Sequence, residues 1–244
     1  AALMDAYEQQ FLQELERVIG PARQENARNA PALWWFSGAY HGHPVRVGLH
    51  TRGRGLSSMT VCASLLGLPL RLLVNARSNT TILATPEVRT GDPAFDSGFL
   101  VNGFPEEVVQ AVLEDSTRSF LRAEYPDFHA NLSTEDGWLR FGKSLRSNFD
   151  RSAPPVPVGD FEAYVHTVVG MSIRLAQAFH ARRAEIQHTQ GEEAALGWEQ
   201  KQHDLVSAVG SGRRRLRLYV FGGIGCFALL ILCLVLAIGM SVLR

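Results

Sequence analysis

Cysteine and net charge are both scarce in this chain. The sequence has 244 residues but only three cysteines, and its 24 basic and 24 acidic side chains cancel to a formal charge of zero. No two cysteines form a C-x-x-C pair, so neither a zinc site nor a disulfide framework is indicated. A nucleic-acid-binding domain normally carries an excess of positive charge, which argues against a nucleic-acid partner. Hydrophobic residues make up 46% of the chain, and this content excludes a disordered protein.

Common catalytic signatures are missing as well. The sequence contains no G-x-S-x-G, H-E-x-x-H, P-loop or dinucleotide-binding motif. His41 and His43 could bind Zn or Cu only with a third ligand, and we interpret them as exposed turn histidines. Asp92 and Asp96 could hold Mg²⁺, but we interpret Gly91–Asp96 as a turn in which Asp accepts backbone N–H bonds and Phe95 enters the core. We therefore predict no catalytic residue, no metal ligand and no cofactor.

One long segment, by contrast, carries no charge at all. Residues 218–243 are uncharged, and as a helix they would extend about 39 Å, enough to cross a hydrocarbon layer about 30 Å thick. We predict that this segment is a transmembrane helix in contact with membrane lipid. Its small residues and cysteines suit close contact with another helix, and we expect that contact at Gly222, Gly225, Cys226 and Cys233.

The flanks of this segment predict its orientation. A cationic cluster precedes it, made of Arg213, Arg214, Arg215 and Arg217. Cationic flanks stay on the cytoplasmic side of a membrane, and the N-terminal residues do not resemble a signal peptide. We expect a single-pass protein of the inner (cytoplasmic) membrane, with its large domain in the cytoplasm.

Residues 1–150 alternate between helical and strand patterns. Apolar residues at spacings of three and four predict helices at 2–19 and 105–124. Alternating and β-branched runs, separated by turn residues, predict two hairpins, 33–40 with 44–51 and 128–133 with 138–143. Between them, similar runs predict a pair of strands, 59–66 with 68–76, and a possible fifth strand at 80–84. Strands that come in hairpins predict an α+β fold with a mostly antiparallel sheet and flanking helices.

A different pattern follows a proline-rich linker at 151–159. Residues 160–212 predict a helical stalk, and its first half carries a heptad repeat with polar breaks at Ser172 and Arg182. We call the apolar members of this repeat the heptad stripe: Phe161, Val165, Val168, Leu175, Phe179 and Ile186. The stripe must pack on its own domain, on a second copy or on another subunit. We expect one of the last two, because Pro154, Pro155 and Pro157 favour an extended spacer.

These patterns divide the chain into four parts. They are an α+β domain at 1–150, the linker at 151–159, the stalk at 160–212, and the basic flank with its transmembrane anchor at 213–244. The fold class expected is α+β, followed by a helical stalk and one C-terminal transmembrane helix.

Two runs of this sequence resemble those of a known group of proteins. The run TGDPAFDSGFLVNG at 90–103 is similar to a TGDPxFDxxFxVxG signature in uncharacterised bacterial membrane-anchored proteins, and SGAYHG at 37–42 resembles their SGxYxGxxV hairpin. His43 stands where a basic residue is usual. The resemblance covers roughly residues 33–145 and implies an α+β domain without implying an activity.

The function expected from these observations is non-enzymatic. We expect a membrane-anchored accessory, scaffold or assembly subunit of a larger bacterial membrane complex, with other membrane-protein subunits or a second copy as partners. Two alternatives remain open. One is a membrane-tethered, metal-dependent enzyme that uses Asp92 and Asp96, and the other is a ligand-sensing domain that signals through the stalk.

Overall fold

The computed structural model describes residues 6–26, 33–52, 55–77, 87–124, 131–144 and 160–209. The expected strand at 80–84, the linker at 151–159 and the anchor with its arginine flank at 213–244 lie outside these ranges. Within them, no helix combines the length and the apolar character needed to cross a membrane. The chain forms two compact units, Ala1–Gln202 and His203–Arg244, and the elements below belong to the first unit except where the last helix continues beyond Gln202.

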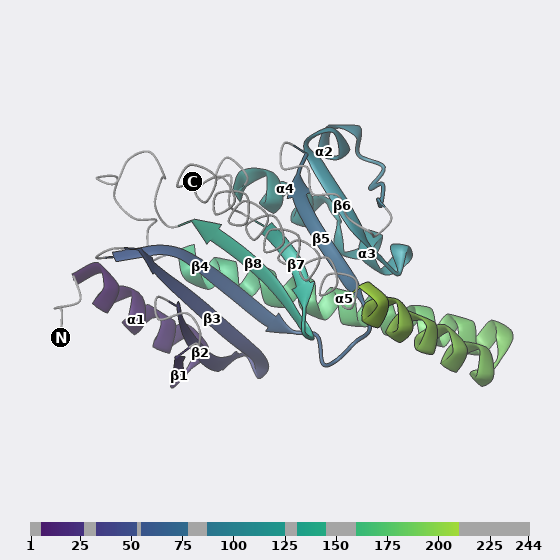
Figure 1. Ribbon diagram of the computed structural model, residues 1–244, viewed down its shortest axis with the longest axis horizontal. Helices are drawn as coiled ribbons and strands as arrows, with labels where there is room; N and C mark the ends of the chain where they lie inside the picture. Colours follow the sequence, from purple (N-terminus) through teal and green to yellow (C-terminus); the bar gives the residue numbers. More distant parts are fainter. Residues whose placement is uncertain are drawn as a thin grey trace, which may run out of the picture. The chain divides into compact units, whose positions relative to one another are not determined.

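One antiparallel sheet of eight strands organises the first unit (Figure 1). Its strands lie in the order β1-β2-β3-β4-β8-β7-β5-β6. Their bounds are β1 Arg23–Asn26, β2 Leu33–Tyr40, β3 His43–Arg52, β4 Gly55–Ser64, β5 Arg71–Ala76, β6 Phe99–Phe104, β7 Asn131–Glu135 and β8 Trp138–Ser144. The antiparallel α+β class predicted from the sequence is confirmed.

Five helices pack on the same face of this sheet, which we call the helix face. They are α1 Ala6–Ile19, α2 Pro93–Gly98, α3 Glu106–Val112, α4 Asp115–Glu124 and α5 Phe161–Gln190, and a further helix spans 192–209. Alternation along the strands turns Val47, Val61 and Phe141 to the helix face, where they are fully buried. Arg46, Cys62 and Arg140 belong to the opposite face, which we call the open face because no helix of the described part packs on it.

Glycine allows two helices to approach the sheet closely. A Cβ on Gly38 in β2 would lie 2.3 Å from the Ile19 carbonyl oxygen of α1. A Cβ on Gly103 in β6 would lie 2.7 Å from a methyl group of Val109 in α3 and closer still to the backbone of β5. Any larger residue at these two positions would push a helix or a strand away.

Two hairpins were predicted correctly, and the proposed second strand pair was wrong. The β2–β3 hairpin turns at His41-Gly42 and the β7–β8 hairpin at Asp136-Gly137, where all four residues have positive φ. However, β4 pairs with β3 and β8, whereas β5 pairs with β6 and β7. The β7–β8 hairpin inserts between them, and the Leu65 amide after β4 donates to the Gly137 carbonyl at 2.9 Å.

The single helix expected at 105–124 is two helices. The first, α3, ends at Val112, and the Leu113 cap has φ −88° and ψ 44°, outside the helical region. Arg118 in α4 donates to the Leu113 carbonyl, so a side chain satisfies a carbonyl group freed by the break. The apolar stripe continues across the break because Val109, Leu113 and Leu121 remain buried.

The heptad stripe lies inside its own domain, and the expectation that it faces a partner is wrong. All six of its residues are buried, and the first five belong to the same core as Val47, Val61 and Phe141. Phe161 makes an edge contact with Phe11 of α1, with ring centroids 5.2 Å apart. Periodicity showed that this face must be buried, but it could not show which surface buries it. The first unit accordingly continues to Gln202 and includes most of the stalk.

The polar break in the stripe has a specific role. Ser172 is completely buried, and its hydroxyl donates to the Ser64 carbonyl at the end of β4 at 2.7 Å. Beyond the sheet, α5 pairs with the helix at 192–209 through Phe179 and Trp198, whose rings are 4.9 Å apart. Arg183 binds Glu192 at 2.8 Å and Glu199 at 3.0 Å across the same helix pair.

We predict that truncating one residue of the stripe destabilises the whole first unit. Leu175→Ala should lower the free energy of unfolding by about 3 kcal/mol, because it opens a cavity in the shared core. Ile173→Ala is the matched control, since Ile173 is 40% exposed on the same helix and should change stability by less than about 0.5 kcal/mol. Urea unfolding followed by circular dichroism measures both. Equal effects of the two variants would contradict the packing described above.

Candidate functional site

The TGDPAFD segment forms the entry to α2. Gly91 has φ +79°, a conformation that glycine adopts without strain. Asp92 then caps the helix: its Oδ1 atom accepts the Phe95 amide at 3.0 Å, and its carbonyl accepts the Asp96 amide at 2.8 Å. Pro93 occupies the first helical turn, where a missing N–H has no cost. The predicted turn, with Asp as the acceptor of a backbone bond, is confirmed.

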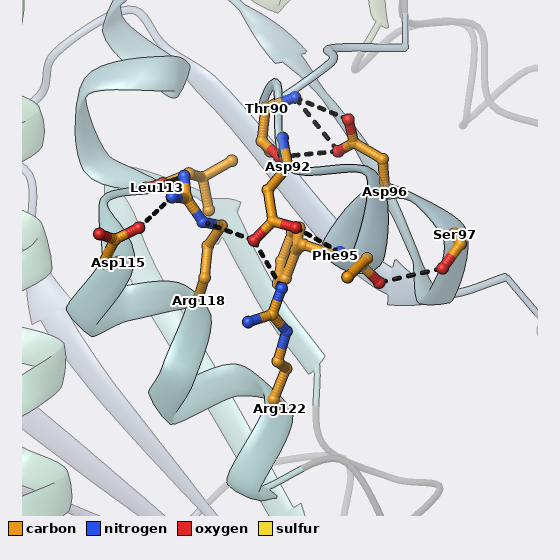
Figure 2. Close-up of polar contacts among 10 residues, drawn as sticks. Thr90, Asp92, Phe95, Asp96, Ser97, Leu113, Asp115, Arg118 and Arg122 are labelled. Atoms are coloured by element: carbon orange, nitrogen blue, oxygen red, sulfur yellow. Dashed lines mark hydrogen bonds and ion pairs between the residues drawn. The ribbon is translucent and has the colours of Figure 1, made fainter.

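The second carboxylate oxygen of Asp92 faces two arginines of α4 (Figure 2). Oδ2 lies 2.5 Å from an Nη atom of Arg122 and 3.4 Å from Nε of Arg118. The Phe95 amide and the Arg122 guanidinium lower the pKa of Asp92, although burial acts in the opposite direction. Asp92 thus connects the start of α2 to α4 across 30 residues of sequence.

Asp96 binds Thr90, and its carboxylate lies apart from that of Asp92, which faces the arginines (Figure 2). Its two oxygens accept the Thr90 amide at 3.1 and 3.2 Å, and Oδ1 also accepts the Thr90 hydroxyl at 2.8 Å. Every oxygen of the two carboxylates therefore has a donor from the protein, and the two groups do not converge on a common point. This arrangement closes a loop and offers no ready pair of ligands for Mg²⁺. Elsewhere in the described ranges, no three metal-ligating side chains cluster together.

Phe95 holds this loop on the core. It is completely buried, as the sequence predicted, and its ring stacks on Phe99 with centroids 4.3 Å apart. The Arg122 guanidinium lies over the Phe95 ring, 5.6 Å from its centroid. One arginine thus binds the capping carboxylate and covers the buried aromatic ring.

A hollow of about 430 Å³ lies on the other side of the same loop, lined by Arg77, Arg89, Gly91, Pro93, Asp96 and Ser97. Its two arginines share one carboxylate oxygen of Glu87, at 2.5 Å from Arg77 and 3.3 Å from Arg89. Arg77 also donates from Nε to the Asp96 carbonyl at 2.6 Å. Because Glu87 and Asp96 balance the two arginines, the hollow has no net charge to attract an ion.

The two turn histidines have different environments. His41 is exposed, as expected, with its ring edge-on to Tyr40 at 4.3 Å. His43 is half-buried, and its Nε2 atom lies 2.9 Å from the Ser64 carbonyl and 3.1 Å from the Ser172 hydroxyl. The expectation that His43 is an exposed turn residue is therefore wrong, because α5 packs on the β2–β3 hairpin and brings Ser172 to it.

The sequence analysis missed a buried polar cluster on the helix face. Lys143 of β8 forms an ion pair with Glu124 at the end of α4, with Nζ and Oε2 2.6 Å apart, and both side chains are at most 13% exposed. The Tyr164 hydroxyl of α5 donates to Glu124 Oε1 at 3.0 Å and also contacts the Lys143 ammonium group. We call these three residues the Lys143 clasp, because they join α4, β8 and α5.

Burial and pairing act in opposite directions on the Lys143 clasp. Burial alone would lower the pKa of Lys143, but its bonds with Glu124 and Tyr164 outweigh burial and raise that pKa. Burial raises the pKa of the Tyr164 hydroxyl. One signal in the sequence could have revealed the cluster: strand alternation places Lys143 on the same face as Leu139 and Phe141, where a lysine requires a buried partner.

The other predicted site residues do not meet at this site. The heptad stripe is in the core, so it is not available to a partner. The expected membrane contacts at Gly222, Gly225, Cys226 and Cys233, and the flank at Arg213, Arg214, Arg215 and Arg217, lie outside the described residues.

We predict that Asp92 has a structural role. Asp92→Ala removes both the helix cap and the arginine partner, whereas Asp92→Asn keeps an acceptor for the Phe95 amide. The melting temperature should fall by roughly 3 °C for the alanine variant, less for the asparagine variant, and hardly at all for the control Asp115→Asn, whose carboxylate is 95% exposed. Differential scanning fluorimetry measures the melting temperatures of the three variants. A rise in melting temperature with Mg²⁺ that Asp92→Asn abolishes would contradict it.

We predict that the Lys143 clasp makes stability fall at alkaline pH. Lys143→Met leaves Glu124 buried without its partner and should cost about 3 kcal/mol, and adding Glu124→Gln should restore part of that loss. The pKa values of Lys143 and Tyr164 are higher in the folded protein than in the unfolded chain. Their contribution to the free energy of unfolding is therefore complete below the pKa values of the unfolded chain, and it is lost as the pH rises through the pKa values of the folded protein. Urea unfolding in alkaline buffers should show a steeper decline for the wild type than for Lys143→Met. If the stabilities of the wild type and of Lys143→Met fall equally with pH, the proposed role of the Lys143 clasp is contradicted.

Comparisons with known proteins leave the family of this chain open. No protein-family model and no curated protein sequence matches it. Among solved structures, the crystal structure of the mycobacterial trehalose monomycolate transport factor A, TtfA, matches with a TM-score of 0.37 and 7% sequence identity, over 64% of this chain and 79% of that chain. A similarity of this size supports no statement about fold or function.

Proposed function

We propose that this chain is a non-enzymatic, single-span protein of a bacterial inner membrane, with its α+β domain on the cytoplasmic side. It would act as an accessory or assembly subunit of a larger membrane complex. The observation that carries the proposal is that the polar clusters of the described domain connect its own elements. Asp92 and Asp96 close a loop, and the Lys143 clasp joins two helices to the sheet.

The proposed membrane location rests on the sequence. Residues 218–243 form an uncharged segment long enough to span a bilayer, and an arginine cluster precedes them. The helix at 192–209 precedes this segment in the sequence.

The two alternative functions have less support from the geometry. A metal-dependent enzyme would need Asp92 and Asp96 to converge, but they bind Arg122 and Thr90 on different sides of the loop. A ligand sensor would need a site with unsatisfied polar groups. The hollow beside the loop has its two arginines paired with Glu87.

We predict that arginines within 218–243 release the protein from membranes. Leu230→Arg with Leu234→Arg should move the chain from the membrane pellet to the soluble fraction after an alkaline wash, because each arginine at the centre of a span costs about 3 kcal/mol. The matched control is Leu196→Arg with Leu205→Arg, which changes two exposed leucines of the helix at 192–209 and should leave the chain in the pellet. An unchanged distribution of the Leu230/Leu234 variant would contradict the anchor.

The accessory role has its own test. The wild-type chain, extracted in mild detergent, should migrate in native gels as a complex heavier than one copy, and mass spectrometry should find other membrane proteins in that band. A lone monomer would contradict the accessory role even if the anchor is confirmed.

A further inference from the structure

Three arginines stand in one straight row on the open face of the sheet. The strand registers pair Arg23 with Ser37, Ser37 with Arg46, Arg46 with Cys62 and Cys62 with Arg140. The row therefore crosses β1, β2, β3, β4 and β8, with an arginine on every second strand and a small residue between. We call Arg23, Arg46 and Arg140 the arginine row. Since side chains directly opposite each other point to the same face, all three belong to the open face.

One member of the row has unused charge. Arg23 and Arg46 are both exposed, and Arg46 forms no ion pair with any side chain that the structure describes. The Arg46 guanidinium lies over the Trp138 ring, 5.0 Å from its centroid. Stacking holds a guanidinium in place while its N–H groups remain free at the edge, where they can donate to a carboxylate. Arg46 is thus oriented for an anion without being neutralised by one.

Arg140 is only partly engaged at the other end of the row. It binds Glu135 at 2.6 Å and lies 3.8 Å from Asp136, and these acids are 51% and 83% exposed. Between the two arginines, Cys62 is buried, and burial raises the pKa of its thiol to about 12 against the opposing effect of Arg140 and Arg46. The thiol is therefore neutral and adds no negative charge to the row.

The spacing of the arginines matches an extended chain. Neighbouring strands are about 4.8 Å apart, so arginines on alternate strands are separated by about 9.6 Å. A polypeptide in the extended polyproline II conformation has three residues per turn and advances about 3.1 Å per residue, so every third side chain points the same way and repeats at about 9.3 Å. Acidic side chains at every third position of such a segment would meet successive arginines, and Arg–carboxylate pairs form two parallel hydrogen bonds.

We propose that the arginine row binds an extended acidic segment of a partner protein, with the segment running across the strands. This inference rests on the proposed accessory function and assigns it a surface. The row is a single side chain wide. The adjacent row on the same face contains Glu25, Trp35, Gly48, Thr60 and Gly142, none of them basic, and the Trp35 ring covers Gly48. A single row of basic side chains beside an aromatic ring suits the binding of one extended polypeptide. An anionic bilayer surface would instead be bound by basic side chains distributed over a wider area.

The test measures peptide binding to the full-length protein in neutral-lipid nanodiscs. The probe is a fluorescent peptide with glutamate at every third position and serine between, and the control peptide has the same composition with its glutamates adjacent. At low ionic strength, Arg46→Gln should weaken binding of the spaced peptide about tenfold, as expected for the loss of a charged hydrogen-bonded pair. Arg89→Gln, which changes a 67% exposed arginine of the hollow, should alter binding less than about twofold.

A charge reversal provides the second variant. Arg23→Glu with Arg46→Glu should abolish binding of the glutamate peptide and create binding of the matching lysine peptide, with an unchanged melting temperature. The inference is overturned by absence of binding, by equal effects of Arg46→Gln and Arg89→Gln, or by equal binding of the two glutamate peptides. It is also overturned if phosphatidylglycerol in the nanodisc displaces the spaced peptide through Arg46, since the row then faces lipid. If the chain forms a complex in mild detergent but its peptide binding does not depend on Arg46, the accessory function stands and only the binding role of the arginine row is contradicted.

Discussion

Burial of the heptad stripe of α5 against the helix face of the sheet is the contact on which the rest of this structure depends. An antiparallel sheet with one apolar face needs a cover, and α5 supplies the longest one. The helix reaches the core of α1 through Phe161, the end of β4 through Ser172 and the helix at 192–209 through Phe179. Removing α5 would expose the centre of the sheet and leave Lys143 and Glu124 without Tyr164.

This packing determines which surfaces remain for function. Since α1 to α5 lie on the helix face, the open face keeps the side chains that the core does not use, and the arginine row is part of it. The loop at 90–96 is at the other end of the sheet order, beside β6. Its Asp92 is paired with Arg118 and Arg122, and its Asp96 accepts hydrogen bonds from Thr90. The domain thus separates a region of internal polar contacts from a region with unpaired charge.

Local sequence patterns predicted the features that depend on local chemistry. The turns at His41-Gly42 and Asp136-Gly137, the cap by Asp92 and the burial of Phe95 all follow from residues within a few positions of each other. Features that depend on distant contacts were not predicted. The place of β5 in the sheet depends on the β7–β8 hairpin, which lies about sixty residues later in the chain. The partner of Lys143 is on another helix, and a heptad repeat gives the width of an apolar stripe but not the surface that covers it.

In this structure α5 is part of the core of the domain and does not project from it as a stalk. Hydrogen–deuterium exchange of the full-length chain, followed by mass spectrometry, measures this. The amides of α5 between Phe161 and Phe179 should exchange as slowly as those of β4 and β8, and urea should expose all three segments together, because one cooperative unit protects them. Exchange of α5 well before β4 and β8, with the two strands still protected, would show that α5 is not part of that core.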